Sequence, residues 1–119
     1  MHKTLYASAA RTTGLHTSAE ISAAGFSGAK FYLVVPAAAT GTVQPRIQSY
    51  DKTGSAWVDV PGAIYAATGT SAGAVLVVHP AITSTVNAAV PTVLGDTLRA
   101  ISTVATTTVT FSLGVDLIR

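Results

Sequence analysis

The chain of 119 residues contains no cysteine and few charged residues. Without a thiol it can form no disulfide and no thiolate metal site, although proteins without cysteine occur on both sides of a membrane. Charged residues make up 10% of the sequence, against roughly 25% in an average soluble domain. Because mixed surface charge normally keeps a monomer dispersed, this shortage predicts that other subunits cover much of the exterior. The alternative is that uncharged Thr, Ser and Gly supply enough polarity.

Long basic or apolar runs are missing as well. No two of the seven Lys and Arg residues are adjacent, and the net charge is +2. The sequence therefore has no run of cationic residues that could contact successive phosphates of a nucleic acid, and we expect no nucleic-acid partner. The longest apolar stretches, residues 31–39 and 72–78, are about half the ~20 residues of a membrane-spanning helix, and we expect no membrane partner. The first 14 residues lack the apolar core of a secretory signal, which predicts that they belong to the mature protein.

What the sequence does contain is alternation of apolar and polar residues with a period of two. Residues 106–119 show it best, because five large apolar side chains alternate with small or polar ones and therefore share one face of a strand. These five are Val109, Phe111, Leu113, Val115 and Leu117. Residues 30–35 and 74–79 are apolar without alternation, which is typical of central strands covered on both faces.

Further strands are predicted at residues 42–50, 56–60 and 97–104, with weaker patterns at 5–11 and 19–24. Pro45 cannot donate a backbone hydrogen bond, so its strand belongs at a sheet edge or carries a bulge. Turn signals recur at roughly the 8 to 12 residue spacing of sandwiches and barrels. Residues 80–96 lack clear alternation, and we expect them to form a crossing loop between sheets.

These patterns predict an all-β fold, a single antiparallel two-sheet sandwich of about eight strands, either jelly-roll or Ig-like. The length fits one domain with a substantial hydrophobic core. We divide the chain into an N-terminal segment, residues 1–15, as a candidate interaction arm, and the sandwich domain, residues 16–119.

The acids and histidines form no recognisable catalytic or metal-binding motif. Asp51 and Asp59 are the only acids expected to lie close together, across one hairpin, where turns normally carry acids. His79 ends a buried strand before a proline, and no G-x-S-x-G elbow accompanies the histidines. Residues 69–73 lack the Lys and the helix of a phosphate loop, and residues 51–59 offer too few oxygen ligands for calcium. We predict that the chain is not an enzyme and uses no cofactor and no metal.

The segment at residues 47–60 gathers the only tryptophan and one of the four tyrosines around a Lys-Thr-Gly turn. Alternation places Val58 and Val60 on the core side and Trp57 and Asp59 on the outer face. An outward tryptophan on a charge-poor surface predicts a contact, either an aromatic platform for a sugar or a protein interface. We favour the protein interface.

Four segments resemble a known family in content and order: residues 5–14, 30–60, 75–82 and 97–118. They contain a Tyr-Ala-Ser-Ala-Ala-Arg-Thr opening, a strand that ends in an Ala/Pro/Gly loop, an Ile-Gln hairpin and two closing strands. In these features the chain is similar to small β-sandwich virion proteins encoded among the head genes of tailed bacteriophages. The similarity covers nearly the whole chain, through patterns of strands and turns.

The resemblance implies a β-sandwich that decorates or cements the capsid by binding the major capsid protein, often as a homotrimer. Such a protein would lie on the capsid exterior of a virion assembled in the host cytoplasm, and the resemblance carries over no catalytic residue. The alternatives are a carbohydrate-binding sandwich displayed on a virion or cell surface, and a tail or connector subunit. We expect the N-terminal segment and the hairpin to make the contacts, through Leu5, Tyr6, Arg11, Arg46, Tyr50, Lys52 and Trp57.

Overall fold

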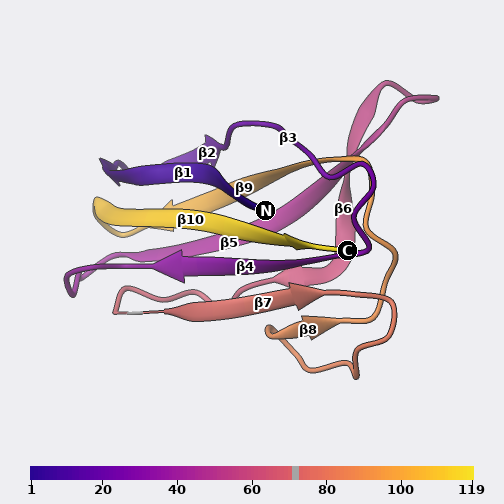
Figure 1. Ribbon diagram of the computed structural model, residues 1–119. Coiled ribbons are helices and arrows are strands. Elements are labelled where there is room, and N and C mark those ends of the chain that lie inside the picture. The colour runs from indigo at the N-terminus through magenta and orange to yellow at the C-terminus, as the bar shows by residue number, and fades with distance from the viewer. Residues whose placement is uncertain (71–72) are drawn as a thin grey trace.

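The computed structural model describes residues 1–70 and 73–119. These residues form ten β-strands and no helix, arranged in two five-stranded sheets (Figure 1). Each of the eight segments predicted as a strand contains one, which confirms the all-β class. The two additional strands are short: β2 (Gly14–Thr17) follows a predicted turn, and β8 (Ala89–Val90) lies inside the predicted crossing loop. No helix of the described chain is long and apolar enough to cross a membrane.

The first sheet has the strand order β1 (His2–Arg11), β10 (Val109–Ile118), β4 (Gly28–Val34), β7 (Ala74–Val78) and β8. Its pairs are antiparallel except for β7 with β8, which run parallel. The five apolar residues predicted to share one face of β10 are all buried. β4 is central, as expected, but its residues alternate between buried and half-buried. Its outer face is therefore partly open, whereas the sequence predicted cover on both faces.

The second sheet has the order β2, β9 (Thr97–Ala105), β5 (Thr42–Asp51) and β6 (Ala56–Ile64), and β3 (Ile21–Ser22) also pairs with β9. β5 lies between β9 and β6, so Pro45 is not at an edge. Instead the β5–β6 pairing carries an irregularity: Arg46 is opposite Ile64, while Gln48 is opposite Asp59. Of the two predictions for this strand, an edge position or a bulge, the second is met by an irregularity that lies after Pro45, between Arg46 and Gln48.

Buried side chains from both sheets belong to one hydrophobic cluster, and two tyrosines connect the sheets through it. Tyr65, just after β6, donates its hydroxyl proton to the Phe31 carbonyl of β4 at 2.8 Å. Tyr6 of β1 donates to the carbonyls of His16 and Ala100, at 2.7 and 3.1 Å. Burial raises the pKa of both phenols above the ordinary value, so each hydroxyl stays protonated and remains a donor.

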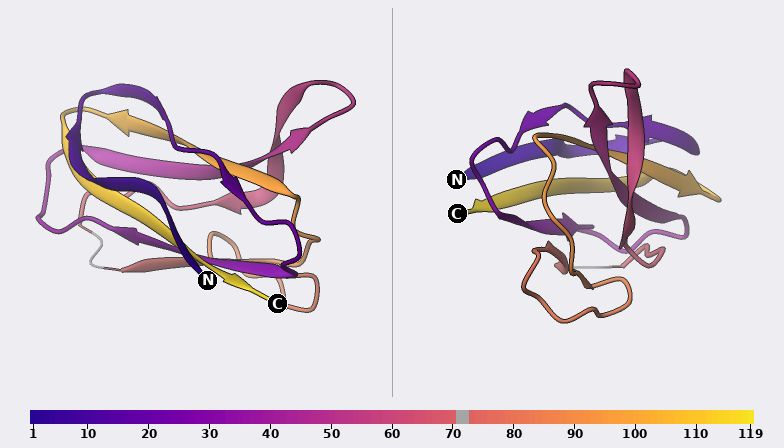
Figure 2. Two further views of the ribbon diagram at one scale, coloured as in Figure 1. Left: turned by 45° about the horizontal axis from the view of Figure 1, so that its top comes forward. Right: turned by 90° about the vertical axis from the view of Figure 1, so that its right-hand side faces the viewer.

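The N-terminal segment, residues 1–15, lies within the fold. β1 pairs with β10 from His2 to Arg11, with two register shifts on the way. At its start, the Met1 carbonyl accepts a hydrogen bond of 2.7 Å from the Leu117 amide. The two ends of the chain therefore lie side by side (Figure 2). The segment that the sequence suggested as an arm is the edge of the first sheet.

Candidate functional site

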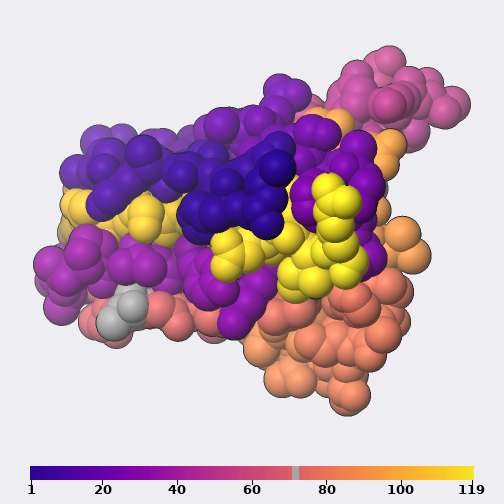
Figure 3. All heavy atoms as spheres, viewed as in Figure 1, coloured from indigo at the N-terminus to yellow at the C-terminus, as the bar shows by residue number. Residues whose placement is uncertain are grey.

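The β5–β6 hairpin extends beyond the two sheets, and its turn stands clear of the body (Figures 1 and 3). The turn is organised by Asp51, whose Oδ1 accepts a hydrogen bond of 3.0 Å from the Thr53 amide. Gly54 packs against the same carboxylate, because a Cβ added there would lie 2.9 Å from Asp51 Oδ2. Ser55 completes the turn with a φ of 52°. A short, ordered turn is thus presented to solvent on two long strands.

An aromatic pair lies on the outer face of the hairpin. Tyr50 and Trp57 are cross-strand partners, and their ring centres are 5.1 Å apart with 60° between the ring planes. Tyr50 is 36% exposed and Trp57 is half-buried. The guanidinium carbon of Arg99, on β9, lies 4.3 Å from the centre of the Trp57 ring. One face of the only tryptophan is therefore already occupied by a cation of the same chain.

A chain of polar side chains continues from Arg99 across the same face. Arg99 Nε donates to Gln48 Oε1 at 2.9 Å, and Gln48 Nε2 donates to Asp59 Oδ1 at 2.8 Å. The same Asp59 oxygen accepts a bond of 3.2 Å from Arg46 Nε. These bonds hold three neighbouring strands in register on their outer side. Trp57 and Asp59 share this face, as the alternation predicted.

The opposite face of the hairpin differs from the prediction at Val58. Val60 packs partly against the core, but Val58 is 54% exposed. Alternation does point Val58 toward the core side, but the hairpin extends beyond the end of the core, so the side chain meets no buried partner. Val58 is therefore a surface residue, and the prediction that it holds the hairpin to the core was wrong.

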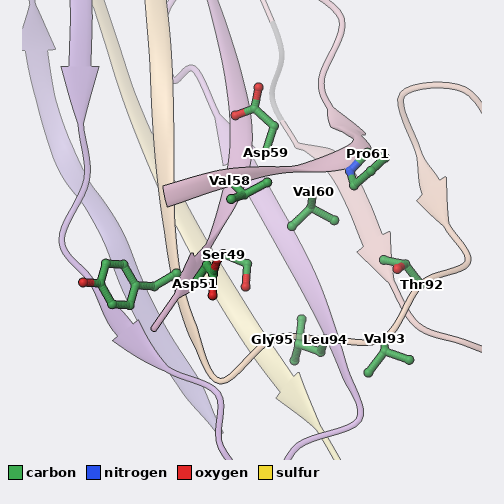
Figure 4. A pocket seen from close by; sticks show the side chains of 11 residues that line it. Ser49, Asp51, Val58, Asp59, Val60, Pro61, Thr92, Val93, Leu94 and Gly95 are labelled. Atoms are coloured by element: carbon green, nitrogen blue, oxygen red, sulfur yellow. The ribbon is translucent and has the colours of Figure 1, made fainter. Parts of the chain in front are cut away.

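Val58 lines a groove of about 320 Å³ at the base of the hairpin. One wall is the hairpin, from Ser49 to Asp51 and from Val58 to Pro61. The other wall is the segment that leads into β9, residues 92–95, where Val93 is 78% exposed. Figure 4 shows Val60 pointing from β6 toward this segment, whereas Asp59 points away from it. The groove is thus mainly apolar, with one exposed valine on each side; a smaller hollow of about 220 Å³ adjoins it at Pro61.

The seven residues predicted to make contacts fall into two groups. Leu5 and Tyr6 are 4% and 3% exposed and belong to the core. Arg11 lies over the rings of Tyr6 and Phe111, at 4.9 and 4.6 Å, and donates to the carbonyls around the irregular part of β1. These three side chains maintain the fold, and we leave them out of the candidate surface.

The other four predicted residues lie on the β5–β6 hairpin: Arg46, Tyr50, Lys52 and Trp57. Arg46 is tied to Asp59, and Trp57 to Arg99, whereas Lys52 projects from the turn. The sequence reasoning missed Val93 and Arg99, which complete the two faces. The sequence offered one signal for Val93, namely an apolar residue between Pro91 and Gly95 in a segment that was expected to form a loop.

No group of three or more metal-ligating side chains is present in the described parts of the chain. Each histidine instead has one structural contact. His2 Nδ1 lies 2.7 Å from Asp116 Oδ1, and this hydrogen bond lowers the pKa of Asp116. His16 Nε2 lies 2.6 Å from the Thr12 carbonyl oxygen, and His79 Nδ1 accepts from the Ala81 amide at 3.0 Å. The histidines stabilise strand ends and turns.

No known protein family, curated protein or solved structure matches this chain. What the chain does must therefore be inferred from its own residues. They present one protruding hairpin, with a self-contained polar and aromatic face on one side and an apolar groove on the other. Such an arrangement can bind another macromolecule through a small, rigid projection.

Proposed function

We propose that this chain is a non-enzymatic structural protein of a phage virion. In this proposal it is a two-sheet β-sandwich, jelly-roll or Ig-like, that decorates or cements the capsid exterior by binding the major capsid protein as a homotrimer. The resemblance of four segments to small virion sandwiches supports the role. The single hydrophobic cluster shared by both sheets supports the sandwich.

The observation that carries the proposal is the exposed apolar surface around the hairpin. Val58 and Val93 are 54% and 78% exposed, and they line the two sides of one groove. Only 10% of the residues are charged, so little surface charge opposes burial of this region. Exposed apolar residues that gather at one end of a charge-poor domain favour a protein contact.

A cement protein acts by mass action. If it binds the assembled shell and not separated subunits, occupied sites add free energy that the shell loses on disassembly. At a free concentration about 100 times the dissociation constant, each site contributes about 2.7 kcal/mol. A rigid domain suits this role, because little conformational entropy is lost when it binds. The hydrogen bonds among Arg46, Gln48, Asp59 and Arg99 supply such rigidity next to the hairpin.

The carbohydrate alternative has less support from the same residues. A sugar ring stacks on an open aromatic face, but the Arg99 guanidinium already lies on one face of Trp57. The polar groups nearby, Gln48 and Asp59, are also engaged with each other. A neutral sugar would have to displace interactions that the chain satisfies internally. A tail or connector subunit is the other alternative, and it predicts larger rings rather than trimers.

The test is binding to empty shells assembled from the major capsid protein of the same virus. We expect saturable co-sedimentation at a fixed ratio of chain to capsid protein, together with a higher thermal transition of the shell. Val93→Ser should weaken this binding, whereas the matched control Leu15→Ser, an exposed residue of β2, should not. Absence of binding to shells at saturating concentration would overturn the proposal, and binding to tails or glycans instead would support one of the alternatives.

A further inference from the structure

The charges of the hairpin turn differ from those of the rest of the chain. Six of the seven cationic side chains contact a hydrogen-bond acceptor or an aromatic ring of their own chain: Lys3, Arg11, Lys30, Arg46, Arg99 and Arg119. Lys52 is the seventh, and within residues 1–70 and 73–119 it has no such partner. It lies in the turn that stands clear of the body (Figure 2).

A matching anion lies beside the groove. Asp51, Asp59 and Asp116 accept hydrogen bonds from neighbouring groups. Among the described residues the carboxylates of Glu20 and Asp96 have no partner, and only Asp96 is a chain neighbour of a residue that lines the groove. Asp96 directly follows Gly95 in the groove wall and is exposed. Its position is fixed, because its carbonyl accepts a hydrogen bond of 2.6 Å from the Ala23 amide. An unpaired anion thus flanks the apolar groove.

The size of the groove limits what can occupy it. Its volume of about 320 Å³ is at the lower end of the range for small-molecule pockets, so it can hold a turn but not a domain. The hairpin turn carries only small side chains around Lys52, namely Thr53, Gly54 and Ser55. A turn of this kind can approach a shallow groove closely, and its lysine can reach an acid at the rim.

We propose that the hairpin turn of one copy docks in the groove of a second copy, with Lys52 of the first beside Asp96 of the second. The turn covers Val58 and Val93, the two exposed valines of the groove. Because turn and groove are different surfaces, the contact is head-to-tail and can close as a ring. This inference deepens the proposed function and rests on its homotrimer, for which it supplies the contact.

The two parts of the contact have different roles. An exposed ion pair contributes little affinity, because water and salt screen it. It selects the partner and fixes the register, since like charges placed in contact are strongly unfavourable. Burial of the two valines provides the affinity. Charge reversal should therefore disrupt the contact more than charge removal does.

The test is sedimentation velocity of the purified full chain, without capsid protein, over a range of concentrations. The wild-type chain should associate to three times its 12.0 kDa mass. Lys52→Glu and Asp96→Lys should each raise the dissociation constant by about tenfold or more, and the double variant should recover most of the wild-type affinity. Val93→Ser should weaken association, whereas Leu15→Ser and Glu20→Lys, two exposed controls, should leave it unchanged. Circular dichroism and melting curves show that each variant is folded.

The possible outcomes of these measurements distinguish three claims: the docking of the hairpin, the homotrimer and the binding to the capsid. A wild-type chain that stays monomeric at its solubility limit, or a double variant no better than the single ones, overturns the docking of the hairpin. Single variants that self-associate normally but bind shells poorly assign the groove to the capsid protein, and also overturn it. A dimer that obeys the charge-swap pattern supports the docking but contradicts the trimer of the proposed function. Failure to bind shells contradicts the proposed function alone.

Discussion

The guanidinium of Arg99 lies 4.3 Å from the ring centre of Trp57, although the two residues belong to strands separated by β5. The contact spans the outer face of the second sheet, and the Gln48 side chain between them accepts a hydrogen bond from the same guanidinium. Trp57 is therefore part of an internal stack rather than a free platform. Since it is the only tryptophan, its fluorescence reports directly on this stack.

We expect Arg99→Ala to lower the free energy of unfolding by about 1 to 2 kcal/mol, since it removes a cation–π contact and a hydrogen bond to a charged donor. Trp57 emission should shift as the ring loses its neighbour. Arg99→Lys keeps the charge but not the planar stack, so its loss should be intermediate. Urea unfolding followed by fluorescence measures both effects. An unchanged midpoint and spectrum in Arg99→Ala would show that the stack does not form in solution.

The sequence predicted where the strands lie along the chain better than it predicted which strands lie side by side. The Arg99–Trp57 contact shows why. Alternation is a local property, so it identified both faces of β10 and the outward direction of Trp57. Strand order is not local, and nothing in the pattern indicated that β9 would pair with β5. Val58 illustrates the same limit, because its face was predictable but the place where the core ends was not.

The N-terminal residues were misplaced for a second physical reason. In an ideal strand Leu5 and Tyr6 would point to opposite faces, so one of them should have been available for contacts. The register shifts of β1, one between Thr4 and Tyr6, let both consecutive side chains become buried. A bulge adds one residue to a strand and leaves no clear trace in a single sequence.

We expect Tyr65→Phe to lower the free energy of unfolding by about 1 kcal/mol, because it removes the hydrogen bond to the buried Phe31 carbonyl. Tyr6→Phe should cost at least as much, since its hydroxyl contacts two carbonyls. The exposed Tyr50→Phe is the matched control and should be neutral. Urea denaturation of the three variants measures these differences. Equal stability of all three would contradict the connecting role of the buried hydroxyls.

The raised pKa of Tyr65 predicts a loss of stability in alkali. The folded chain holds the phenol neutral, whereas the unfolded chain loses the proton near the ordinary value of 10.0. The stabilising effect is complete below pH 10 and declines as the pH rises toward the folded pKa, because the unfolded state then binds fewer protons. Unfolding free energies measured between pH 8 and 11 should fall less steeply in Tyr65→Phe than in the wild-type chain.

The pair of His2 with Asp116 predicts an acid-sensitive N-terminal strand. The hydrogen bond from His2 lowers the pKa of Asp116 below the ordinary 3.8, so its contribution is present above that value and lost as the pH falls through the folded pKa. Asp116→Asn should remove this dependence while leaving the core intact. Hydrogen exchange of residues 2–4 measured across the acid range tests this, with the central strand β4 as an internal reference.

Gly41, at the end of the loop before β5, should tolerate no larger residue. A Cβ at this position would meet the carbonyl oxygens of Ala105, the last residue of β9, and of Thr107, in the turn that follows. Backbone atoms cannot rotate away, so we expect Gly41→Ala to lower the free energy of unfolding by about 1 to 3 kcal/mol, as other overpacked sites do. Gly73→Ala is the control, because an added Cβ there meets no atom of residues 1–70 or 73–119 within 4 Å. Thermal melts that give both variants the same midpoint would contradict this close approach of the two loops.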